Sequence, residues 1–146
     1  MAVWLTASAA WVGRAALNLI GAVQIAQRRR LERFETCAAR GITLLRDWLS
    51  PQQREQFDLH NYFEVIGCDT GRSYRIQHGV STNVIELDWD GQPRTGWCFL
   101  PEGNLVAGDV MLAQKIALET DECGALAVAR QFLVPPPLAP RLEATM

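Results

Sequence analysis

The chain of 146 residues contains little lysine and little histidine. Arginine supplies all but one of its 14 basic residues, and 16 acidic residues give a net charge of −2. Domains dedicated to nucleic-acid binding carry a strongly basic surface, so this composition argues against that class of protein. Nucleic acid is therefore not an expected partner.

Closely spaced cysteines are also absent. No Cys-x-x-Cys pair occurs, whereas zinc ribbons and zinc fingers take their ligands in close pairs. The four cysteines are Cys37, Cys68, Cys98 and Cys123. A dispersed Cys2His2 set is the alternative to free thiols, and its members are His60, Cys68, His78 and Cys98. We expect free thiols, no metal and no other cofactor.

A long uninterrupted apolar run is missing too. Residues 1–30 are rich in Ala, Leu, Ile and Val and predict a helix. Arg14 and Asn18 interrupt this apolar run, and it ends at Arg28–Arg30. A membrane span needs about twenty mostly apolar residues, and no secretory signal is predicted because no charged segment precedes the run. Two interpretations stay open: a helix that packs or oligomerises, and a helix that anchors the chain in the inner membrane or lies on its surface.

Helical spacing continues after the arginines. Apolar residues step by three and four along one predicted helix face, at Leu31, Phe34, Ala38, Ile42, Leu45 and Leu49. Gly41 is a candidate break in this helix. Ser50 and Gln53 form a capping box around Pro51, so a second helix is predicted from Pro51 to Leu59.

The middle of the chain changes to an alternation of apolar and polar residues. In the third segment Ile85, Leu87 and Trp89 share one face, with Glu86 and Asp88 opposite. Four strands are predicted, over residues 62–66, 73–78, 82–89 and 95–100. Turn residues separate them, which predicts an antiparallel meander with one face exposed to water.

The C-terminal part predicts helices again. Asp109 is the predicted N-cap of a helix that begins at residue 110, and residues 125–132 predict further helix before Pro135–Pro137. The fold class is therefore α+β, with N-terminal helices, a four-stranded antiparallel meander and a C-terminal helical segment over 109–132. The predicted parts of the chain are an apolar helix over 1–30, an α+β domain over 31–132 and a Pro-rich tail over 133–146.

The tripeptide Asp69-Thr70-Gly71 carries the catalytic carboxylate in aspartic proteases. Those enzymes need two carboxylates that share a proton, and Arg72 beside the motif opposes that sharing by lowering the carboxylate pKa. A hairpin turn requires the same residue types. We interpret the tripeptide as a turn, and we predict no catalytic residue.

Two further arrangements fit chemistry only in part. Cys68 or Cys98 beside His78 on a neighbouring strand would form a nucleophile pair, although no local signature accompanies it. Three acids resemble a metal cluster but fit a solvated helix end better, namely Glu119, Asp121 and Glu122.

Several short motifs are similar to those of a known group of proteins. Gly71–Ile76 reads G-R-x-Y-R-I, Asn83-Val84 follows, Cys98 precedes Pro101, and Asp109–Glu119 reads DVMLAQKIALE. In these motifs residues 44–130 resemble a group of short uncharacterised bacterial proteins, mainly from alphaproteobacteria. The resemblance implies a bacterial, cytoplasmic-facing domain and brings no reaction or ligand with it.

These observations favour a non-catalytic interaction or scaffold module with a protein partner, or one that self-associates through residues 2–30. The first alternative is a membrane-tethered accessory protein that contacts the inner membrane through the same residues. The second alternative is a small enzyme that uses a Cys/His site on the sheet.

Overall fold

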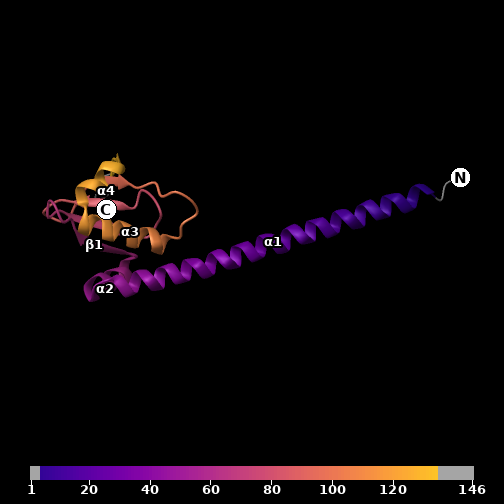
Figure 1. Ribbon diagram of the computed structural model, residues 1–146, viewed down its shortest axis with the longest axis horizontal. Coiled ribbons are helices and arrows are strands. Elements are labelled where there is room, and N and C mark those ends of the chain that lie inside the picture. Colours follow the sequence, from indigo (N-terminus) through magenta and orange to yellow (C-terminus); the bar gives the residue numbers. More distant parts are fainter. Residues whose placement is uncertain (1–3, 135–146) are drawn as a thin grey trace, which may run out of the picture. The chain divides into compact units, whose positions relative to one another are not determined.

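The computed structural model describes the backbone of residues 4–134 and the side chains of residues 21–134. The chain divides into two compact units, Met1–Ala39 and Arg40–Met146, and each is described by itself. Figure 1 shows the elements in chain order. The predicted Pro-rich tail lies outside the described residues, apart from Leu133 and Val134.

Helix α1 runs without interruption from Trp4 to Trp48, so the predicted break at Gly41 does not occur. Gly41 instead lies where two backbones approach closely, since a Cβ atom on Gly108 would lie 2.2 Å from the carbonyl carbon of Gly41. As for the membrane-anchor interpretation, no helix among the described residues combines the length and the hydrophobicity that a bilayer crossing needs.

Helix α2 spans Pro51–His60 and begins as predicted. The Ser50 hydroxyl accepts a hydrogen bond from the Gln53 backbone, and the Ser50 backbone donates to the Gln53 side chain. Two glutamines of α2 also bind the outer edge of the first strand. The Gln53 amide donates to the Glu64 carbonyl oxygen at 2.8 Å, and Gln56 accepts from the Glu64 N–H at 3.0 Å.

The sheet is antiparallel throughout, in the order β1-β2-β3-β4-β5. Its strands are β1 Tyr62–Ile66, β2 Ser73–Gln77, β3 Val84–Leu87, β4 Pro93–Cys98 and β5 Arg130–Phe132. The first four strands confirm the predicted meander within the α+β class. The fifth was predicted as helix, and that prediction is wrong. Gly96 makes the pairing sterically feasible, because a Cβ atom there would lie 2.2 Å from the Phe132 ring.

Helices α3 (Ala107–Thr120) and α4 (Glu122–Val128) follow the meander. Asp109 is not the N-cap of α3. The cap is Val106, which makes no side-chain capping bond, and Asp109 lies in the first turn. The earlier start places Gly108 inside the helix, where its backbone meets that of Gly41.

The core of the second unit lies between one face of the sheet and the helices. It contains Leu45, Leu49, Phe57, Phe63, Val65, Tyr74, Ile76, Val84, Trp97, Met111, Leu112, Leu118 and Ala125. Strand β3 is buried on both faces. Its register pairs Val84 with Ile76 and Glu86 with Tyr74, so the charged Glu86 faces the core side of the sheet.

Candidate functional site

The turn that contains Asp69 and Thr70 is held by a buried carboxylate from a distant part of the chain. Glu122, at the start of α4, is fully buried. Its carboxylate accepts hydrogen bonds from the backbone of Asp69 at 2.8 Å and Thr70 at 2.7 Å, and from the hydroxyls of Thr70 at 2.5 Å and Tyr74 at 2.6 Å. Four donors therefore converge on one negative charge.

A second bond runs in the opposite direction. The Asp69 carboxylate accepts a hydrogen bond from the backbone of Cys123 at 2.8 Å, so each acid binds the segment that carries the other. We call this pair the Asp69–Glu122 clasp. It also requires Gly67, because a Cβ atom there would lie 2.3 Å from the Glu122 carboxyl carbon.

The clasp keeps both acids charged. The Cys123 backbone hydrogen bond lowers the pKa of Asp69. Burial pushes the pKa of Glu122 upward, but hydrogen bonds from Thr70 and Tyr74 outweigh burial and leave that pKa below its ordinary value. Burial and the bond to Glu122 raise the pKa of Tyr74. Asp69 is exposed and engaged in a turn, whereas a protease dyad needs a shared proton.

We expect the clasp to make folding sensitive to acid. In the folded chain the pKa of Glu122 is below its ordinary value of 4.5, and the pKa of Asp69 is below its ordinary value of 3.8. The unfolded chain therefore binds more protons. Their stabilising contribution is complete above about pH 5 and is lost as the pH falls through the folded-state pKa values. Urea unfolding between pH 7 and pH 3 measures this loss. A constant free energy of unfolding over that range would contradict it.

The predicted cysteine–histidine pairs are not brought together. His78 follows β2 and Cys98 ends β4, and β3 lies between these strands, which separates the two residues by about 10 Å. Cys68 and His78 flank opposite ends of β2, about 16 Å apart or more. His60 stacks on Tyr62 with ring centroids 5.3 Å apart. Among the described residues, no group of three or more metal-ligating side chains forms a cluster.

The three acids near the end of α3 have separate partners. Glu119 forms an ion pair with Lys115, one helical turn before it. Asp121 accepts a hydrogen bond from the Gly124 backbone at 3.0 Å and caps α4. Glu122 belongs to the clasp, so the three carboxylates do not converge on one point.

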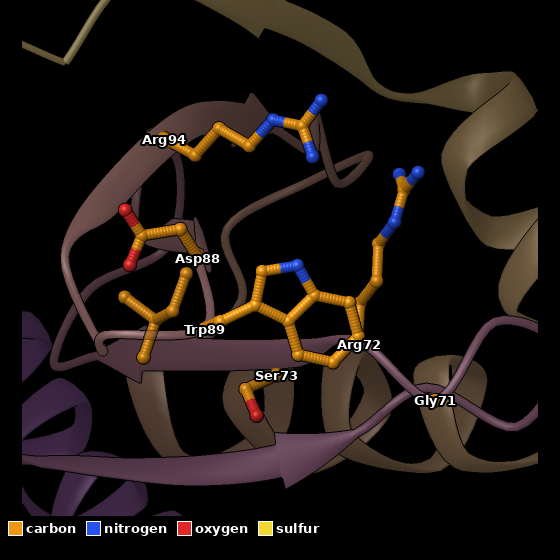
Figure 2. Close-up of a pocket in the computed structure, with 7 residues that line it drawn as sticks. Gly71, Arg72, Ser73, Asp88, Trp89 and Arg94 are labelled. Atoms are coloured by element: carbon orange, nitrogen blue, oxygen red, sulfur yellow. The ribbon is translucent and has the colours of Figure 1, made fainter.

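One pocket was not anticipated from the sequence. It has a volume of about 220 Å³ and lies where the β1–β2 turn meets the β3–β4 hairpin. Its lining residues are Gly71, Arg72, Ser73, Leu87, Asp88, Trp89 and Arg94, and we call it the Trp89 pocket (Figure 2). Trp89 is 100% exposed. Figure 2 shows both guanidinium groups on the same side of its indole ring.

Glu86 forms ion pairs with both arginines of this pocket. It is 3% exposed, and one carboxylate oxygen lies 3.2 Å from the Arg72 guanidinium and 3.7 Å from that of Arg94. The other oxygen accepts a hydrogen bond from the Trp97 indole at 3.2 Å. The sequence signal for this ion-pair site was a glutamate between Ile85 and Leu87 in a predicted strand. A glutamate buried in a strand needs charged or hydrogen-bonding partners.

Helix α1 carries a second surface feature, within the first unit. Described side chains from residue 22 to residue 37 are all exposed. Leu31 is 59% exposed and Phe34 is 49% exposed. These two belong to a row of residues spaced by three and four, which we call the α1 stripe, namely Val23, Gln27, Leu31, Phe34 and Ala38. The glutamine is the polar member of this otherwise apolar row.

Comparisons with known proteins identify no relative. The chain matches no protein-family model, and neither the curated proteins nor the solved structures give a match.

Proposed function

We propose that the protein is a non-catalytic scaffold module that self-associates through the α1 stripe. The observation that carries this proposal is the exposure of large apolar side chains along one face of α1. Helices in proteins gain most of their stability from packing an amphipathic face against other structure. A second copy of the same helix offers a matching face.

The sequence of α1 supports a helix pair. Leu45 and Leu49 continue the spacing of the stripe but are buried in the chain's own core, so a second copy can pack only on the exposed part of the row. If Leu31 and Phe34 occupy the a and d positions of a heptad, Arg30 is at g and Glu35 is at e. A parallel pair then places Arg30 of one copy beside Glu35 of the other, twice in each dimer. Such a dimer presents two copies of the Trp89 pocket.

Replacing Leu31 and Phe34 together with glutamate should separate the copies. Burial of each side chain contributes about 2 kcal/mol, and 1.4 kcal/mol corresponds to tenfold in affinity, so we expect the dissociation constant to rise by at least about 100-fold. Sedimentation equilibrium of the whole chain measures this change. A matched control places two glutamates on the opposite face, at Ile25 and Thr36, and should leave association unchanged. A wild-type chain that stays monomeric at about 100 μM would contradict the proposal.

The charge pairs test the orientation. Arg30→Glu should weaken association, and adding Glu35→Arg should restore it, because the double exchange re-forms the pair with its signs reversed. If neither substitution changes the dissociation constant, the parallel arrangement is wrong.

A second candidate function rests on the arginines of the same helix. Arg28, Arg29, Arg30 and Arg33 lie beside exposed apolar side chains, a combination that binds anionic membrane surfaces. In that case the chain is a membrane-associated accessory protein. Sedimentation with vesicles that contain phosphatidylserine, compared with neutral vesicles, distinguishes it from the scaffold.

A further inference from the structure

We propose that the Trp89 pocket binds the carboxylate of an acidic side chain in a peptide segment, while an apolar neighbour of that side chain packs on Trp89. The two guanidinium groups on one side of the indole ring define where each part of the ligand lies (Figure 2). This inference does not depend on the proposed self-association.

The two arginines have N–H donors that do not face Glu86. Each guanidinium has five N–H groups, and one terminal nitrogen of each faces Glu86. The Arg72 side chain is 45% exposed, and the Arg94 side chain is 60% exposed. Arginine and a carboxylate form charge-assisted, often bidentate hydrogen bonds. Because Glu86 already holds both groups, less conformational entropy is lost when a ligand binds.

The acids near the pocket decide which anion fits. Glu86 is buried and engaged by three partners. Asp88 lines the pocket, but one of its oxygens accepts hydrogen bonds from the backbones of Asp90 and Gln92 at 2.9 and 2.8 Å. The two acids balance the charges of the two arginines, so the guanidinium N–H groups that do not face Glu86, and no surplus of positive charge, are what a single carboxylate would bind. A polyanion would bring further charges close to Asp88 and Asp90, which disfavours nucleic acid.

Trp89 supplies the apolar part of the site. A fully exposed indole loses its contact with water when a ligand covers it, and tryptophan and arginine are the residues most enriched at binding hot spots. Gly71, Ser73 and Leu87 complete the lining. The pocket therefore combines a polar end for a carboxylate with a flat apolar end, which matches an acidic residue beside an aliphatic one.

Fluorine NMR of the full chain labelled with 5-fluorotryptophan tests the proposal. The chain has five tryptophans, and a Trp89→Phe variant assigns the Trp89 resonance. The probe is the peptide acetyl-Gly-Leu-Glu-Leu-Gly-amide, and its matched control has glutamine in place of glutamate. We expect the Trp89 resonance to shift with the acidic peptide and to saturate near millimolar concentration, while the glutamine peptide gives at least about tenfold weaker binding.

Variants then assign the donor groups. Arg94→Met keeps the closer ion pair between Arg72 and Glu86, so we expect the chain to fold and to bind the peptide at least about tenfold more weakly. Arg130→Met removes an exposed positive charge outside the pocket and should bind as wild type. The Trp97 resonance reports on Glu86 and checks that the pocket is intact.

Three results overturn the proposal. The first is an unchanged Trp89 resonance in the presence of excess acidic peptide. The second is equal binding of the glutamate and glutamine peptides. The third is tighter binding of inorganic phosphate or of a short oligothymidylate, which would assign the pocket to phosphate groups.

Discussion

We expect Glu122→Gln to lower the free energy of unfolding by about 3 kcal/mol. The glutamine has the same shape, and its oxygen can still accept from the backbone N–H groups of Asp69 and Thr70. Its amide N–H groups then face the hydroxyls of Thr70 and Tyr74, which must rotate to accept, and the negative charge is lost. Four hydrogen bonds converge on this carboxylate, including those from the Thr70 and Tyr74 hydroxyls. Bonds to a buried charged group are among the strongest in proteins, so this exchange of one atom weakens the Glu122 half of the clasp, while the bond from the Cys123 backbone to Asp69 remains.

Urea unfolding at pH 7, followed by circular dichroism, measures the loss. Glu119→Gln is the matched control, because it removes the same charge from a partly exposed pair with Lys115 and should cost less than about 1 kcal/mol. The variant at Glu122 should also show a weaker dependence of stability on pH below about pH 5. Equal stabilities of the two variants would show that the clasp does not stabilise the fold.

We expect Gly108→Ala to lower the free energy of unfolding by about 3 kcal/mol or more. The added methyl group would lie 2.2 Å from the carbonyl carbon of Gly41, 2.3 Å from its oxygen and 2.5 Å from the nitrogen of Ile42. These are backbone atoms of a regular helix and cannot rotate away as a side chain does. Helices α1 and α3 must therefore separate, and that separation opens the packing around Leu45 and Met111.

Two other glycines provide the comparison for this substitution. Gly41→Ala should cost less, because its nearest neighbour is a movable side-chain atom of Val106, 2.8 Å from the added carbon. Gly21 also lies in a helix but has nothing within 4 Å, so alanine there should raise stability by up to about 1 kcal/mol. Thermal unfolding of the three variants ranks them. A Gly108→Ala variant as stable as wild type would contradict the close contact.

Much of the fold follows from local sequence patterns. The capping box at Ser50 predicts the start of α2, and alternation of apolar residues predicts the four strands of the meander, because both are set by neighbours in the chain. Strand β5 is different. Residues Arg130–Phe132 have no strand signal of their own, and they pair with β4 because Gly96 leaves space for the Phe132 ring.

The candidate site was harder to predict for the same reason. The turn at Asp69 and Gly71 is a local property, and its interpretation needed only the residue types. The partner of that turn, Glu122, is more than 50 residues away, and no spacing connects the two. Trp89 and Arg72 likewise come together only through the pairing of β2 with β3. Contacts of this kind arise from tertiary structure, which a pattern in one segment does not encode.

The glutamines of α2 have a consequence for aggregation. An unpaired strand edge is a template on which further chains add and fibrils grow. Gln53 and Gln56 occupy both backbone hydrogen-bonding groups of Glu64, in the middle of one border strand. Two neutral side chains thereby occupy hydrogen-bonding groups that an added strand would need, which makes the middle of that border a poorer template for polymerisation.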